Sequence, residues 1–324
     1  MKFLRRFGID TYMFLLIGVV ALGVIIPAQG IGAEILGQIT FWAVALLFFL
    51  YGAKLDAASV RAGFMNLRLQ SLSFLATYVM FPVLGLLIAW LMGDLLGPEL
   101  TLGILFLSVL PSTIQSSIAF TAMAGGNVPA AICSASLSNL VAVVLTPTLM
   151  ALILHQSGGI STDAVSKIAL QILFPFVLGQ LLRRWIGSFI QRHKFLTMIV
   201  DRGSILLIVY SAFSAGTVAG IWSAIPVNRL LLLGAVICVF LAIAMWLMAL
   251  TGRYFNLPGP DSTTLLFCGS TKSLASGLPI ATAIFPASQV GAIVLPLMLF
   301  HMIQLLVCAA IAQRKAAENV AALA

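Results

Sequence analysis

Apolar runs follow one another along the whole chain, and each is bounded by a short polar segment. Their lengths of roughly 17–25 residues match what an α-helix needs to cross the hydrocarbon core of a bilayer. The pattern therefore predicts an all-α polytopic membrane protein. The ten predicted spans cover residues 11–27, 36–52, 69–93, 101–124, 128–155, 165–182, 203–222, 230–250, 263–285 and 288–312.

The composition excludes other classes of protein. Hydrophobic residues make up 61% of the 324 residues and charged residues 8%, whereas a soluble domain carries about 25% charged residues. The net charge of +8 arises in short segments between apolar runs. Because no nucleic-acid motif accompanies it, it indicates orientation in a membrane rather than nucleic-acid binding. The four cysteines lack metal-ligand spacing, so we expect neither a disulfide nor a structural metal.

The basic residues test this order of spans, because loops on the cytoplasmic side are enriched in Lys and Arg. With the N-terminus inside, 14 of the 17 basic residues fall on the cytoplasmic side. Lys167 and Arg229 fall outside, and Lys272 lies within a span. We therefore expect both termini to be cytoplasmic. The absence of organellar or glycosylation features favours the cytoplasmic membrane of a bacterium. The cytoplasmic set is Lys2, Arg5, Arg6, Lys54, Arg61, Arg68, Arg183, Arg184, Arg192, Lys194, Arg202, Arg253, Arg314 and Lys315.

Lys272 lies inside the ninth predicted span, in the polar stretch Ser270–Ser273, which Gly277 and Pro279 follow. A lysine in hydrocarbon costs roughly 2.5–3.5 kcal/mol on insertion scales, so it indicates a functional site and needs a partner. The neighbouring hydroxyl residues, Gly and Pro predict that the helix opens here, which requires protein or a water-filled cavity to receive the freed backbone groups. The alternative is a lysine that extends from a helix end to the membrane interface.

Ten spans divide into two sets of five, in residues 1–160 and 161–315, with a cytoplasmic tail at 316–324. An odd number per set inverts the second half in the membrane. Polar residues interrupt the fourth span of each half, and an amide-Val pair, Asn127-Val128 or Gln289-Val290, opens each fifth span. The interrupting residues are Ser112, Thr113, Gln115, Ser116 and Ser117 in the first half and Ser270, Thr271, Lys272 and Ser273 in the second.

Interruptions at corresponding positions of two halves are typical of a transporter's binding site. We therefore predict that the two interrupted stretches face one midplane cavity. The alternative is that small residues merely allow close helix packing. His301, near the middle of the tenth span, could relay protons or be a hydrogen-bonded core histidine, and both interpretations stay open.

The order of Pro111, Ser116-Ser117, Gly126-Asn127 and a Ser-rich fifth span resembles the bile acid:sodium symporter family, as does Ser276-Gly277-Leu278. The stretches Phe48–Asp56 and Ser270–Ser273 look closer to its SBF-like branch of symporters. The resemblance covers essentially the whole chain. It implies an inverted repeat with a panel and a core subdomain, broken crossing helices four and nine, and alternating access.

The same resemblance implies a sodium site. Its hydroxyl ligands would be Ser116 and Ser117, with Ser134 and Ser138 on the fifth span. However, the position of the family's glutamate is Ser270, and an ammonium follows at Lys272. At several ångströms it would repel sodium by about 1–4 kcal/mol. We expect this ammonium to take the place of a sodium ion, donating to Ser116, Ser117 and carbonyls freed at the first interruption. Coupling to sodium or to protons stays open.

These features predict a secondary transporter, a symporter of a small or amphipathic organic anion. Its predicted partners are membrane lipid and that anion, without nucleic acid or any cofactor beyond sodium. One alternative is a regulatory membrane protein of the same fold that has lost transport. An enzyme is not expected, because HExxH, GxSxG and paired intramembrane aspartates are absent from the sequence, and a dyad of Lys272 with Ser270 or Ser273 lacks an oxyanion site.

Overall fold

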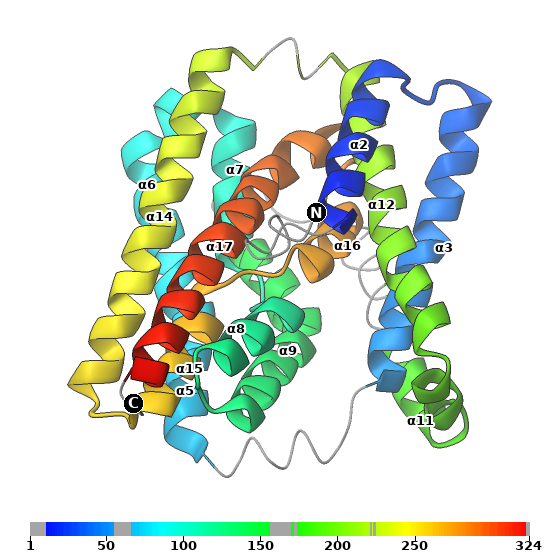
Figure 1. Ribbon diagram of the computed structural model, residues 1–324. Helices are drawn as coiled ribbons and strands as arrows, with labels where there is room; N and C mark the ends of the chain where they lie inside the picture. The colour runs from blue at the N-terminus through cyan, green and yellow to red at the C-terminus, as the bar shows by residue number, and fades with distance from the viewer. Residues whose placement is uncertain are drawn as a thin grey trace.

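The computed structural model describes residues 11–54, 66–155, 170–171, 174–220, 222 and 225–321, and its elements are helices (Figure 1). The longer ones are α2 (Thr11–Ile25), α3 (Ile31–Lys54), α6 (Phe81–Leu96), α9 (Val128–His155), α11 (Phe174–Arg192), α12 (Lys194–Val218), α14 (Val227–Tyr254) and α17 (Ala287–Ala321). The shorter ones are α5 (Leu67–Leu75), the π-helical turn η2 (Ala76–Met80), α7 (Pro98–Ser108), α8 (Gln115–Met123), α15 (Gly259–Ser270) and α16 (Leu274–Ile284).

Within the described residues, six stretches of helix are long and apolar enough to cross a membrane: Ile31–Ala53, Leu67–Leu96, Val128–Ile153, Phe195–Val218, Val227–Tyr254 and Ala287–Asn319. Large apolar side chains on their outer surfaces are exposed, Trp42, Trp90 and Trp246 among them. An apolar surface of this extent does not occur on a protein that water surrounds, and it suits contact with lipid. The chain is a multi-pass membrane protein.

Two predicted spans are displaced relative to the helices. The expected span 165–182 corresponds to α11, which continues to Arg192, and the expected span 203–222 corresponds to α12, which already begins at Lys194. The predicted loop 183–202 is therefore wrong, since the two helices approach to within one residue, His193. Charged residues end an apolar run but not a helix, because Arg and Lys are good helix formers.

Residues 316–321 also differ from the predicted tail, because α17 continues through them. Arg314 pairs with Glu318 one turn later at 2.9 Å, and Asn319 Nδ2 donates to Ala124 O at 3.1 Å. The expected boundary between two halves at residue 160, the expected loop 156–164 and most of the charged segment after Lys54 lie outside the described residues.

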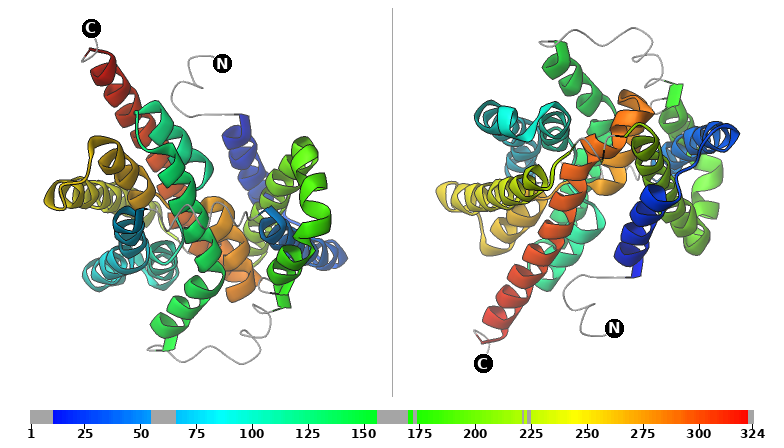
Figure 2. Two further views of the ribbon diagram at one scale, coloured as in Figure 1. Left: turned by 90° about the horizontal axis from the view of Figure 1, so that it is seen from below. Right: turned by 90° about the horizontal axis from the view of Figure 1, so that it is seen from above.

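The helices form two groups that face each other (Figures 1 and 2). In the panel group, α3 packs on α11, and α12 packs on α2 and α3. The core group contains α5 to α9 and α14 to α17, and the rings of Phe81, Phe240 and Phe300 tie α6, α14 and α17 together with centroids 5.3–6.1 Å apart. Helix α12 also packs on α16 and α17, so it joins the two groups.

Hydrogen bonds close one end of the core group, at the bottom of Figure 1. The Asp261 carboxylate, in the first turn of α15, accepts from Asn66 Nδ2 at 2.9 Å and from Asn127 Nδ2 at 2.8 Å. One carboxylate thus fixes the starts of α5, α9 and α15 relative to each other. At the opposite end, Arg229 lies against Gly97.

The close packing of α3 and α11 depends on two glycines. A β-carbon built on Gly52 would lie 2.0 Å from Phe176 O, and one built on Gly179 would lie 2.0 Å from Phe49 O. Helices approach this closely only where a small residue stands at the contact.

We predict that Gly52→Ala and Gly179→Ala each push α3 and α11 apart and reduce the free energy of unfolding by about 1–3 kcal/mol, as overpacking does. Thermal unfolding in detergent measures the effect. Gly37→Ala is the matched control on α3, because no atom lies within 4 Å of the β-carbon that it adds. Equal melting temperatures for all three variants would contradict this account of the packing.

Candidate functional site

The two interrupted stretches lie side by side. Helix α7 ends at Ser108 and α8 begins at Gln115, while α15 ends at Ser270 and α16 begins at Leu274. In the first break, Pro111 has no N–H to continue the helix. Ser273 N donates to Pro111 O at 2.8 Å, which joins the breaks through their backbones. The hydroxyls of Ser112 and Thr113 lie 3.1 and 3.2 Å from Thr271 Oγ1.

Side chains of α9 form hydrogen bonds with backbone groups that lose their helical partners at the first break. Thr146 Oγ1 donates to Val109 O at 2.8 Å, and Asn139 Nδ2 donates to Ser112 O at 2.7 Å. Ser112 N donates to Ser138 Oγ at 3.1 Å. Buried backbone groups need such partners, so Thr146 and Asn139 support the break.

The Lys272 ammonium donates hydrogen bonds to two further carbonyls of this break. Nζ donates to Ser108 O at 2.8 Å, to Leu110 O at 2.6 Å and to Thr77 O at 2.9 Å. It also lies 4.1 Å from the centroid of the Phe81 ring, a cation–π distance. The side chain is fully buried. Three acceptors and an aromatic face match the three donors and the charge of an ammonium, so the contacts describe a cation held by main-chain oxygens.

The third carbonyl is available because of a local change of helix register. In η2, Phe81 N donates to Ala76 O, five residues back, instead of to Thr77 O. Thr77 O would next accept from residue 82, but Pro82 has no N–H. No backbone N–H of its own helix therefore donates to Thr77 O, which accepts from Lys272 Nζ instead. A π-helical turn and one proline thus connect α6 to the second break.

One expectation for Lys272 is corrected, and the alternative position at the interface is ruled out. Its ammonium donates to carbonyls and not to the hydroxyls of Ser116 and Ser117. Ser116 Oγ donates to Thr113 Oγ1 at 2.7 Å, and Ser117 Oγ donates to Thr113 O within its own turn. Carbonyls at the end of α7 suit a cation better because the negative end of the helix dipole lies there. Lys272 also does not extend to the interface, since its amine is bound within the protein.

Gln304 of α17 holds the backbone of the second break. Its Oε1 accepts from Lys272 N at 2.9 Å and its Nε2 donates to Lys272 O at 2.9 Å. The other Nε2 hydrogen faces His301 Nδ1, also at 2.9 Å. Because the Lys272 N–H requires Oε1, the orientation of the amide is set, and His301 Nδ1 must accept. The neutral imidazole therefore carries its proton on Nε2.

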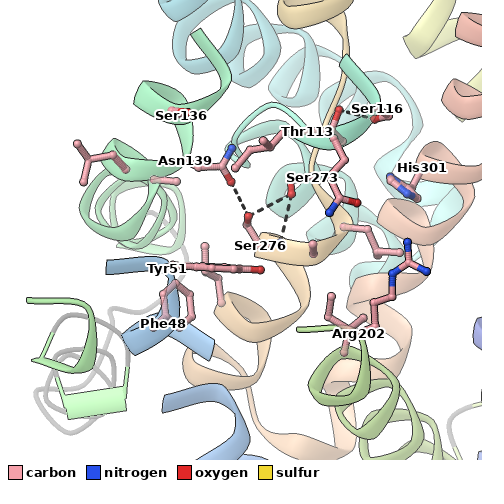
Figure 3. A pocket seen from close by; sticks show the side chains of 18 of the residues that line it. Phe48, Tyr51, Thr113, Ser116, Ser136, Asn139, Arg202, Ser273, Ser276 and His301 are labelled. Carbon is pink, nitrogen blue, oxygen red and sulfur yellow. Dashed lines mark hydrogen bonds between the residues drawn. The ribbon is translucent and has the colours of Figure 1, made fainter. Parts of the chain in front are cut away.

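A cavity of about 660 Å³ lies between the panel and core groups (Figure 3). The panel contributes Leu16, Phe48, Tyr51, Phe176, Arg202 and Ile205. Of the predicted site residues, Thr113, Gln115, Ser116, Ser273 and His301 line it. One wall carries a hydrogen-bonded chain from Ser273 Oγ to Ser276 Oγ at 3.1 Å and on to Asn139 Oδ1 at 2.5 Å.

The other predicted residues of the two breaks lie behind this wall. Ser112, Ser117 and Lys272 make the contacts given above, Ser270 Oγ donates to Leu266 O at 2.5 Å, and Thr271 Oγ1 donates to Phe267 O at 2.8 Å. Of the two interrupted stretches, Thr113, Gln115, Ser116 and Ser273 thus line the cavity, whereas Ser112, Ser117, Ser270, Thr271 and Lys272, contrary to the prediction, do not. The hydroxyls of Ser117, Ser270 and Thr271 donate to carbonyls of their own turns.

Four predicted residues lie elsewhere. Asn127 binds Asp261 at the end of the core group, and Gln289 lies in the first turn of α17. Ser134 and Ser138 are buried on α9, where Ser138 Oγ serves the first break. None of these four is among the cavity-lining residues of the described chain. The amide-Val pairs therefore mark helix starts and not the cavity.

Sequence reasoning missed Arg202, Gln304 and Thr77. Arg202 was assigned to a loop, but it lies in α12 and lines the cavity. The signals were present, because an arginine or glutamine in a membrane helix indicates a functional contact.

Of the four serines expected to hold sodium, Ser116 lines the cavity and the other three do not. Ser116 and Ser117 donate their hydroxyl protons within the first break, and Ser138 Oγ accepts from Ser112 N there. No Asp or Glu from the described residues lines the cavity. Sodium prefers several hard oxygen ligands and a compensating charge, whereas the charge at the breaks here is that of the Lys272 ammonium.

Comparison with known proteins agrees with this architecture. The sequence matches the SBF-like CPA transporter family over residues 10–317. The chain belongs to this family. It is 50% identical over 313 residues to the uncharacterized protein PA2026 of Pseudomonas aeruginosa, which covers 96% of this chain and 94% of that one.

It is also 46% identical over 308 residues to the protein of Escherichia coli strain K12 named "Putative symporter YfeH", covering 94% of this chain and 92% of that one. The sodium/bile acid cotransporter 7 of Rattus norvegicus is 25% identical over 313 residues, 94% of this chain and 92% of its own. The predicted resemblance is confirmed. The family and the cotransporter 7 are transporters, not enzymes.

We predict that Lys272→Ala destabilises the protein strongly, because three buried carbonyls lose their donor and each such loss costs about 1–3 kcal/mol. Methylammonium, which fits the space of the lost amine and carries the same three donors, should raise the melting temperature of this variant and not that of the parent. Tetramethylammonium, which has no N–H donor, is the matched control. Rescue by both cations, or by neither, would contradict recognition through hydrogen bonds.

Proposed function

We propose that the chain is a secondary active transporter that carries a small or amphipathic organic anion by alternating access. The observation that carries this proposal is the cavity between the two helix groups, because Arg202 lines it and no acidic side chain of the described residues does. A site for a cationic substrate would be lined by acidic rather than basic side chains.

Helix ends add to this preference for anions. Helix α8 begins at Gln115 and α16 begins at Leu274, and both residues line the cavity. The N-terminal end of a helix carries a partial positive charge and N–H groups without intrahelical partners. Ser273 caps α16, whereas Ile114 offers α8 no side-chain cap. The first N–H groups of α8 are thus suited to a bound anion.

The proposed membrane architecture has ten spans in two inverted halves, with α2, α3, α11 and α12 as the panel and the other helices as the core. Matching breaks in the fourth and ninth segments support it. The contacts at one end of the core group also agree with it, because Asn66, Asn127 and Asp261 meet there. The distribution of basic residues assigns all three to the cytoplasmic side.

We further propose that Lys272 takes the place of a sodium ion at the breaks, and that protons are the coupling ion rather than sodium. The three carbonyl ligands of the ammonium support this assignment, and so does the lack of an acidic side chain among the described residues that line the cavity. The sodium/bile acid cotransporter 7 and YfeH, as their names state, are a cotransporter and a symporter, which supports coupled transport here. The localisation that we propose is the cytoplasmic membrane of a bacterium.

Uptake of organic acids by proteoliposomes tests the function and the coupling. We predict that a proton gradient drives uptake and that a sodium gradient alone does not. Lys272→Ala and Lys272→Gln should lose gradient-driven accumulation. Sodium-driven uptake that survives both substitutions would refute the role of Lys272. A parent protein without any uptake under either gradient would instead favour a transport-inactive regulatory protein.

Cysteine labelling tests the topology. In a cysteine-free background, His193→Cys at the junction of α11 and α12 should react with an impermeant reagent only from the cytoplasmic side. Ala219→Cys, at the end of α12, should react only from outside, as should cysteines in 156–164. Both described positions are exposed. Labelling of His193→Cys in intact cells would overturn the assignment of sides.

A further inference from the structure

Arg202 stands out among the charged residues because it lies inside an apolar helix. It falls within Phe195–Val218, one of the helices long enough to cross a membrane. An arginine at such a position is costly and marks a functional contact. Its side chain is half-buried and lines the cavity from the panel side.

His301 lines the same cavity from α17, in the core group. Because Gln304 Nε2 donates to His301 Nδ1, the proton of the neutral ring lies on Nε2. The Gln304 amide also accepts from Lys272 N and donates to Lys272 O, and these two bonds prevent the amide from flipping. Figure 3 shows the Arg202 guanidinium directed toward the His301 ring. Two N–H donors from opposite helix groups therefore serve one side of the cavity.

The far side of the cavity has a different character. Phe48 and Tyr51 of α3 lie there, away from Arg202 (Figure 3), and Phe176 of α11 adds to the same lining. The cavity thus has a cationic side and an aromatic side. Its volume of about 660 Å³ is within the usual range for a site that encloses a small organic ligand.

We infer that Arg202 and His301 together bind the oxyanion head of the substrate, a carboxylate or sulfonate, while its apolar body lies against Phe48, Tyr51 and Phe176. This inference rests on the proposed transport of an organic anion and specifies the site. A planar guanidinium offers paired N–H donors to such a head group. Because α12 and α17 belong to different groups, one bound head group connects panel and core, so substrate binding favours the state in which the two are closed on each other.

Binding of a matched series of naphthyl compounds to purified protein in detergent tests the site. We expect naphthoate and naphthalenesulfonate to bind more tightly than the uncharged naphthamide, and the comparison of the two acids tells which head group the site prefers. Arg202→Gln should weaken binding of both anions by about ten- to a hundredfold, the loss of a charge-assisted contact. It should leave naphthamide binding unchanged. Arg202→Lys keeps the charge but not the paired donors, so its affinity for the anions should lie between those of the parent and of Arg202→Gln.

Arg253→Gln is the control, because Arg253 is exposed at the end of α14, outside the cavity lining. At His301, Gln can return an N–H near the position of Nε2, so His301→Gln should bind the anions better than His301→Phe. Anion affinity in Arg202→Gln equal to that of the parent would overturn the site, as would a parent that binds naphthamide as tightly as the anions or binds none of the series.

Different results would refute the binding site and the proposed transport function. Organic-anion uptake that persists in Arg202→Gln with unchanged affinity would refute this site and leave the proposed function standing. A parent that neither binds nor takes up organic anions would refute the proposed function itself.

Discussion

The structure depends on one charged group, the Lys272 ammonium, held by three main-chain carbonyls. A buried cation without a carboxylate partner needs oxygen ligands that are already in place. Each of the three arises from an irregularity in a helix: the end of α7 at Ser108, the turn that follows it at Leu110 and the π-helical turn at Thr77. The irregular backbone and the lysine therefore stabilise each other, because each supplies hydrogen-bond partners that the other needs away from water.

This mutual dependence explains how the breaks can line a cavity. The breaks keep most of their polar groups bound to one another, to α9 and to Gln304, so only a few side chains and helix ends face the cavity. Gln304 has a special place in this arrangement, since it binds the backbone of Lys272 on one side and His301 on the other. An occupant that contacts His301 therefore acts on a residue that shares a hydrogen-bonding amide with the second break.

The positions of the breaks and their proximity could be predicted from sequence, because Pro111 and the polar residues around Lys272 interrupt apolar runs at corresponding places. The contacts of Lys272 were only half predictable. Freed carbonyls at the first break follow from the loss of the helix, but Thr77 depends on a register shift before Pro82 in a distant helix. The serines of both breaks were expected to face the cavity, yet Ser117 and Ser270 bind the backbone of their own turns.

Arg202 shows a different limit. A hydropathy pattern ends a span at the first charged residues, so α12 was placed too late and its arginine was assigned to a loop. The helix nevertheless begins at Lys194, because Lys and Arg are good helix formers. After Arg202 its residues Ile205, Ile208 and Val209 are buried, whereas Phe195 and Leu196 before it are exposed. The basic side chain that lines the cavity is thus Arg202, while Lys272, whose charge the sequence made prominent, lies behind the wall.

The most direct test of this account is an NMR measurement on protein with ¹⁵N-labelled lysine and ¹³C-labelled carbonyls in a membrane mimetic. The account predicts an ammonium resonance for Lys272 whose protons exchange slowly with water and correlate through hydrogen bonds with the carbonyls of Thr77, Ser108 and Leu110. A Lys272 amine that exchanges as fast as an exposed lysine, or that shows no correlation with these carbonyls, would contradict the central claim.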